Sequence, residues 1–208
     1  GIFLKGIPGT GKTSIIKAIA NMTGRHIIKV NNININILKR TFYNNHIGAY
    51  HIPNNKRLYI IEEIDCCGLK NIVKKRELIS KEIKKVTCKE DSIDVKVEEN
   101  EETLSELLEL MDGIIETDGR MIIFTSNHPE YIDPALLRPG RIDITIDLNN
   151  LLKENINDMY KHWFKEEIPK EIYTKMKDYN YTQAEIGNLF NINDRLIINE
   201  KLSKNERL

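Results

Sequence analysis

The sequence predicts an α/β fold, in which a parallel five-stranded sheet flanked by helices is followed by a small helical lid. Short β-branched runs alternate with amphipathic helical patterns, as in βαβ units. A glycine-rich turn separates the first run from the first helical pattern, and strand signals end after Asp147. The length of 208 residues suits one large domain with a small appendage.

The predicted strands are short runs rich in isoleucine and other β-formers, at residues 2–5, 26–30, 58–61, 121–125 and 142–146. The third run, Leu-Tyr-Ile-Ile, is continuously apolar. Continuous apolar runs are typical of strands that are buried on both faces of a parallel sheet. We therefore expect this strand to lie in the interior of the sheet.

Helices are predicted where apolar residues recur at helical spacing. The first covers residues 12–21 and stops before Gly24, and the second covers 104–111 with Thr103 as its N-cap. Two further helices, at 151–164 and 182–190, form the predicted lid. These patterns predict a nucleotide-binding core over residues 1–148 and a lid over 149–208.

Residues 66–102 interrupt this alternation. Their first part is mostly basic and their last part, 90–102, mostly acidic. We interpret the segment as a charged insertion, solvated and paired within itself.

Composition limits the classes of protein that fit. The 31 basic and 31 acidic residues give a net charge of +0, which excludes a basic field over the whole surface for nucleic acid or anionic membranes. The three cysteines, an odd number, indicate a reducing compartment and lack the spacing of zinc ligands. No apolar run approaches the roughly 20 residues of a membrane span. We therefore expect the chain itself to be soluble. We also expect it to be a piece of a longer protein, because it begins one residue before a strand.

Residues 6–13, Gly-Ile-Pro-Gly-Thr-Gly-Lys-Thr, match the phosphate-binding loop pattern between a strand and a helix. The glycines let backbone N–H groups point at phosphate oxygens, and the helix adds its positive N-terminal end. Lys12 would bridge the β- and γ-phosphates, while the Thr13 hydroxyl would hold Mg²⁺. The predicted ligands are ATP and Mg²⁺, and the predicted nucleotide contacts are Gly6, Ile7, Pro8, Gly9, Thr10, Gly11, Lys12, Thr13 and Ser14.

Two carboxylates, Glu62 and Glu63, follow the third predicted strand. Ligands of parallel sheets bind at the carboxyl ends of the strands. One carboxylate can hold Mg²⁺ while its neighbour orients and deprotonates the attacking water. Strand alternation sends the two side chains in opposite directions, so we expect them to have different roles.

With these motifs the chain resembles the AAA+ ATPases, whose core is a P-loop NTPase fold. Residues 121–127 resemble the sensor-one strand of that family, and residues 132–143, which include Arg-Pro-Gly-Arg, resemble its second region of homology. Residues 103–113 and the Asn-His-Pro-Glu stretch at 127–130 are similar to the Bcs-type mitochondrial AAA translocases, chaperones that insert the Rieske iron–sulfur protein. The resemblance is strong over residues 1–147 and faint in the lid.

The resemblance implies roles for single residues. Glu62 stands at the magnesium-coordinating carboxylate, Glu63 at the catalytic glutamate, and Asn127 at the polar sensor of the γ-phosphate or attacking water. Arg138 and Arg141 stand at the arginines presented to the nucleotide of a neighbouring subunit. Because they flank a Pro-Gly turn, both guanidiniums are expected to be exposed.

The function implied is that of an ATP-hydrolysing motor that remodels or translocates a protein substrate as a ring homo-oligomer, a hexamer or heptamer. A clamp-loader-like or helicase-like ATPase acting on nucleic acid is the alternative, disfavoured by the neutral charge. A nucleotide-gated scaffold is a third reading. Membrane contact, at the mitochondrial inner membrane or elsewhere, is expected only through a part of the protein preceding Gly1.

Phe42 and Tyr43 have two interpretations. They follow the second predicted strand, where a substrate-gripping pore loop of such a ring lies. They also fit the face of an amphipathic helix with Ile37 and Leu38, the interpretation that the pattern favours.

Overall fold

The computed structural model describes residues 1–30, 35–66, 98–112 and 119–205. The chain forms two compact units, one of Gly1–Lys5 with Ile16–Ile146 and one of Gly6–Ile15 with Asp147–Leu208. Most of the predicted insertion, residues 67–97, lies outside the described residues. The domain boundary after residue 148 stays a prediction.

The first unit contains a five-stranded parallel sheet flanked by helices, which confirms the predicted fold class. Its strands are β1 (Ile2–Lys5), β2 (His26–Lys29), β5 (Arg57–Ile61), β6 (Met121–Ser126) and β7 (Ile144–Asp147), and their order is β2-β5-β6-β1-β7. Each agrees with a predicted strand to within two residues. All five residues of β5 are buried, as its apolar run predicts.

The register of the sheet brings the carboxyl ends of three strands together. Ile61 of β5 is paired with Phe124 of β6, and Lys5 of β1 is paired with Ser126 of β6. The residues that follow β5 and β6 therefore leave the sheet at the edge where β1 ends. Ligands of parallel sheets bind at this edge.

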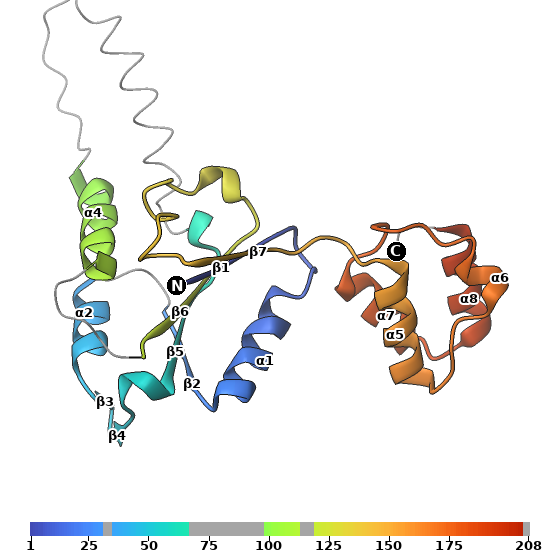
Figure 1. Ribbon diagram of the computed structural model, residues 1–208, viewed down its shortest axis with the longest axis horizontal. Coiled ribbons are helices and arrows are strands. Elements are labelled where there is room, and N and C mark those ends of the chain that lie inside the picture. The colour runs from blue at the N-terminus through green and yellow to red at the C-terminus, as the bar shows by residue number, and fades with distance from the viewer. Residues whose placement is uncertain (31–34, 67–97, 113–118, 206–208) are drawn as a thin grey trace, which may run out of the picture. The chain divides into compact units, whose positions relative to one another are not determined.

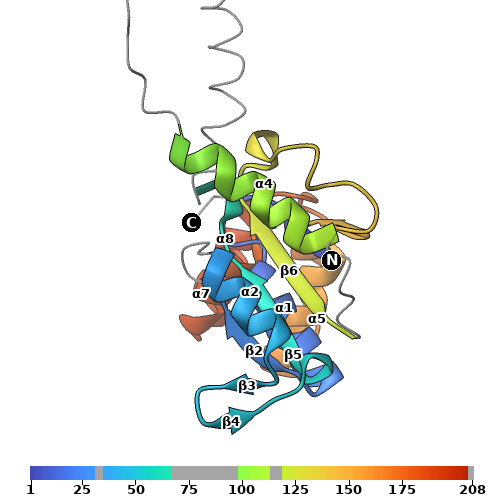
Figure 2. The same ribbon diagram turned by 90° about the vertical axis from the view of Figure 1, so that its left-hand side faces the viewer.

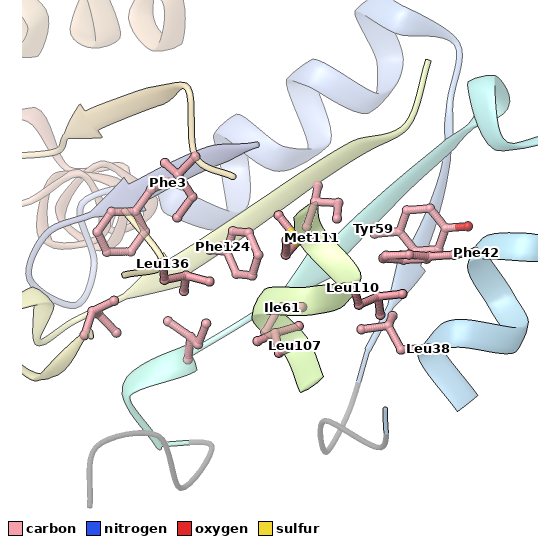
Figure 3. Close-up of a cluster of buried hydrophobic side chains, with 14 residues drawn as sticks. Phe3, Leu38, Phe42, Tyr59, Ile61, Leu107, Leu110, Met111, Phe124 and Leu136 are labelled. Atoms are coloured by element: carbon pink, nitrogen blue, oxygen red, sulfur yellow. The ribbon is translucent and has the colours of Figure 1, made fainter. Parts of the chain in front are cut away.

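Helices cover both faces of the sheet. α1 (Lys12–Thr23) lies on one face, whereas α2 (Ile35–Tyr43) and α4 (Glu98–Asp112) lie side by side on the other (Figures 1 and 2). Alternate strand side chains face these last two helices, and the resulting core is drawn in Figure 3. It includes Phe3, Leu38, Phe42, Tyr59, Ile61, Leu107, Leu110, Met111, Phe124 and Leu136.

Two predictions about helices are settled here. Phe42 is 0% exposed and packs edge-to-face on Tyr59 at a ring-centroid distance of 4.7 Å, so the amphipathic-helix interpretation of this segment is confirmed. Thr103 as the N-cap of the next helix is wrong, because α4 already begins at Glu98. The charged residues before Thr103 carry no apolar periodicity, yet glutamate is a good helix former.

Short elements complete the first unit. The strands β3 (His46–Ile47) and β4 (Tyr50–His51) form an antiparallel hairpin that turns at Gly48. Single 3-10 turns, η1 (Asn54–Lys56), η2 (Ile64–Cys66) and η3 (Pro129–Tyr131), flank β5 and follow β6.

The C-terminal part of the second unit is helical, as predicted, but has more helices than the two predicted. They are α5 (Lys153–Phe164), α6 (Lys170–Tyr173), α7 (Gln183–Asn191) and α8 (Arg195–Lys204). Their apolar faces enclose a separate core that includes Tyr160, Tyr181, Ile186, Phe190 and Leu202. Among the described residues, no helix is long and apolar enough to cross a bilayer.

Candidate active site

The predicted phosphate loop follows β1 directly and leads into α1, which begins at Lys12. Gly9 and Gly11 adopt φ values of +83° and +95°, which residues with a side chain rarely take. Thr10 fixes the turn by donating its hydroxyl to the carbonyl of Ile7 at 2.8 Å. The sequence therefore folds here as a curled loop at the start of a helix, as the glycine spacing predicts.

Lys12 is turned back onto the phosphate loop. Its Nζ donates to the carbonyl oxygens of Gly6 at 2.5 Å and Ile7 at 2.9 Å. The two residues that follow it, Thr13 and Ser14, are exposed at the start of α1. An ammonium held by loop carbonyls can exchange these partners for phosphate oxygens, which are stronger acceptors because they are charged.

The phosphate loop packs against the first residues of α7. The Ala184 N–H donates to the Gly9 carbonyl at 3.0 Å. A Cβ added to Gly11 would lie 1.9 Å from Gln183 Oε1. The start of α7 is itself fixed by a capping box in which Thr182 and Glu185 bind each other's backbone N–H groups. Gly11 is thus required for its φ angle, whereas the Gln183 side chain whose end lies beside it can rotate away.

Glu63 lies two residues beyond β5 in a left-handed conformation, with φ of +51°. Such a backbone is strained for a residue with a side chain. It is held by the Thr125 hydroxyl of β6, which accepts the Glu63 N–H at 3.0 Å. Asn127 Nδ2 lies 3.5 Å from Glu63 Oε1. The structure therefore brings together the predicted base and the predicted sensor.

Glu62 meets a different partner. Its Oε2 lies 2.5 Å from Nζ of Lys29, the last residue of β2. The hydrogen bond and charge of Glu62 raise the pKa of Lys29, and the charge of Glu63 adds to this effect. The two carboxylates do have different environments, as predicted. The reason is the left-handed turn at Glu63, because β5 ends at Ile61 and strand alternation does not reach them.

The residues present fit a magnesium ion chemically. Mg²⁺ binds oxygen ligands and is commonly held by one or two carboxylates together with substrate phosphates. The Glu62 carboxylate and the Thr13 hydroxyl are such donors, and Glu62 already binds a cation, the ammonium of Lys29. In the described part of the chain, no group of three or more His, Cys, Asp or Glu side chains is placed to hold a metal.

The two predicted arginines differ in exposure. Arg138 is exposed, as expected. The expectation of an exposed guanidinium is wrong for Arg141, whose side chain is only 12% exposed. Arg141 donates Nε to Asp112 Oδ1 at 2.7 Å, Nη2 to Asp112 Oδ2, and Nη1 to the Ala135 carbonyl at 2.5 Å. It therefore ties the Pro-Gly turn to the end of α4.

The Arg141–Asp112 pair is held in its charged form. The hydrogen bond from Arg141 lowers the pKa of the Asp112 carboxyl, and the same bond raises the pKa of Arg141. A carboxyl whose pKa is lowered on folding stabilises the fold above its unfolded pKa and loses that effect as pH falls through the folded value. The contribution of this ion pair to holding the turn is therefore present at neutral pH and is lost only in acid.

Sequence reasoning missed three residues of this arrangement: Lys29, Thr125 and Asp112. Each acts on a predicted residue through a contact between segments distant in sequence, the most distant being Thr125 and Glu63. Lys29 lies near the carboxyl end of the predicted strand 26–30, and the carboxyl ends of parallel strands meet at one edge, so this position is the signal that could have identified it.

Comparisons with known proteins agree with these motifs. The family model described as "ATPase family associated with various cellular activities (AAA)" matches residues 2–150. A protein of Acanthamoeba polyphaga mimivirus, named as an AAA family ATPase, is 31% identical over 189 residues, covering 84% of this chain and 91% of that protein. An AAA-ATPase of Arabidopsis thaliana is 35% identical over 174 residues, covering 78% of this chain and 33% of that protein.

A protein of Schizosaccharomyces pombe, named as a probable mitochondrial chaperone bcs1, is 29% identical over 195 residues, or 93% of this chain. The chain spans 38% of this relative and 33% of the first plant relative. It is therefore similar to one part of those longer proteins.

Proposed function

The chain belongs to the AAA family of ATPases, and on that premise we propose that it is a Bcs-like motor that forms a ring and uses ATP hydrolysis to remodel or translocate a protein. The observation that carries the proposal is the strained Glu63, held by Thr125 and lying 3.5 Å from Asn127. Strained backbone that its surroundings hold in place is typical of catalytic positions. A nucleotide-gated scaffold without turnover has no need of this arrangement.

In this proposal the phosphate loop binds ATP through backbone N–H groups of residues 6–14, with Pro8, which has no N–H, contributing only to the shape of the loop. Lys12 exchanges its loop carbonyls for the β- and γ-phosphates, and the Thr13 hydroxyl and the Glu62 carboxylate would hold Mg²⁺. When bound, Mg²⁺ would supply positive charge to the phosphate oxygens. Glu63 takes a proton from the attacking water at its carboxylate, while Asn127 orients the water or the γ-phosphate.

Arg138 is the residue that we propose to reach the nucleotide of a neighbouring subunit. It is exposed on a turn that Arg141 fixes through Asp112 and Ala135. An arginine supplied by a neighbour stabilises charge that develops in the transition state. We propose that Arg141 positions this turn and that hydrolysis requires assembly into a ring.

The proposed substrate class rests on the name of one relative and on the net charge, and the proposed location rests on that name alone. The name of the fission-yeast relative describes a mitochondrial chaperone, which supports a protein substrate and a mitochondrial location for this chain. The neutral net charge is consistent with a protein substrate rather than nucleic acid.

Turnover per subunit is expected to rise with protein concentration, because each site needs Arg138 of a neighbour. The measurement is steady-state ATP hydrolysis over a concentration series, with the oligomer mass of each sample determined by light scattering. Activity and mass should rise together. A constant turnover per subunit across a range in which the mass changes would contradict the proposed ring.

A further inference from the structure

Lys29 is presented to Glu62 by the sheet itself. Lys29 is paired in register with Ile60 of β5, and the N–H of Val30 donates to the Ile60 carbonyl at 2.9 Å. Lys29 therefore ends its strand beside the strand from which Glu62 follows. The distance of 2.5 Å between Lys29 Nζ and Glu62 Oε2 results from two adjacent strand ends.

The two partners differ in their freedom to move. The side chain of Lys29 is 56% exposed, whereas that of Glu62 is 26% exposed. Lysine has a flexible four-carbon stem and a strongly hydrated ammonium, so Lys29 can leave the pair and remain in water. Glu62 is the more fixed partner and would keep its position when the lysine leaves.

We propose that Lys29 is a positioning residue that competes with Mg²⁺ for the Glu62 carboxylate. Lys29 holds Oε2 and offsets its charge when no divalent cation is bound, and it leaves this oxygen when the cation binds. The free Mg²⁺ concentration that nucleotide binding requires is then set partly by Lys29. This inference rests on the proposed function, in which Glu62 is the magnesium carboxylate.

Binding of a fluorescent, slowly hydrolysed ATP analogue over a series of free Mg²⁺ concentrations tests the competition. We expect Lys29→Met, and equally Lys29→Gln, to lower the free Mg²⁺ at half-maximal binding about threefold to fivefold, the scale of a partly exposed ion pair. Lys29→Arg keeps the charge and should behave as the wild type. Lys56→Met removes an exposed lysine just before the opposite end of β5 and should change nothing.

A second background separates competition from a merely structural role. In a protein that already carries Glu62→Gln, adding Lys29→Met should leave the free Mg²⁺ at half-maximal binding unchanged. The carboxylate for which Lys29 and Mg²⁺ compete is absent from both proteins. An unchanged Mg²⁺ dependence in both Lys29→Met and Lys29→Gln, or an equal shift in the Glu62→Gln background, would overturn the competition. If the wild type bound no analogue at any Mg²⁺ concentration, the proposed function itself would fail.

Discussion

Replacing Glu63 with glutamine should leave ATP binding nearly intact and lower turnover about 100-fold or more, the scale of general-base catalysis. Glutamine keeps the length of the side chain and an oxygen that can accept from Asn127, whose Nδ2 lies 3.5 Å from Glu63 Oε1. It removes the carboxylate that would take the proton of the attacking water. Binding is measured by titration calorimetry and turnover by phosphate release.

The matched control for this variant is Glu106→Gln, which makes the same chemical change at an exposed position of α4. It should match the wild type in both measurements. If Glu63→Gln kept turnover within about tenfold of the wild type, below the usual range for a lost general base, Glu63 would not be the base.

Lys12→Ala should lower the affinity for ATP about 100-fold or more, because it removes charge-assisted hydrogen bonds of about 1.5–3 kcal/mol each from the phosphates. The lost contacts are those that Lys12 Nζ now makes with the Gly6 and Ile7 carbonyls and would transfer to the nucleotide. Titration calorimetry with ATP and Mg²⁺ measures the loss. An affinity equal to that of the wild type would refute the phosphate-loop assignment.

Lys17→Ala is the control for Lys12→Ala. Lys17 lies on the same helix, α1, and is exposed, so the substitution removes one positive charge without touching the phosphate loop. Equal losses of affinity in the two variants would indicate a general charge effect.

Much of the fold could be predicted because its signals are local. Each of these signals lies within a few consecutive residues. They are the apolar runs of β1, β5 and β6 and the glycine spacing of the phosphate loop. β1 has its predicted bounds, and the other strands differ from theirs by one or two residues at an end, since hydrogen bonding at a strand end depends on the neighbouring strand. The short α6, of four residues, is too short to show a helical period.

The candidate site was less predictable, because side-chain partners come from distant segments. A Pro-Gly turn predicts exposure of both flanking arginines. Arg141 is instead mostly buried, because it forms an ion pair with Asp112, which lies 29 residues earlier. The left-handed φ of Glu63 depends on the hydroxyl of Thr125 in the adjacent strand. Neither partner is visible in the local pattern, although both segments were singled out by their motifs.

Mixing two inactive variants tests most directly that each site joins Glu63 of one subunit to Arg138 of the next. Glu63→Gln and Arg138→Ala subunits should each hydrolyse ATP poorly alone, since a trans arginine contributes roughly 10³–10⁵ in rate in related enzymes. In mixed rings some interfaces pair an intact Glu63 with an intact Arg138, so turnover should partly return. No recovery in mixtures that are shown by sizing to co-assemble would contradict the account and leave Arg138 without a role in the neighbouring site.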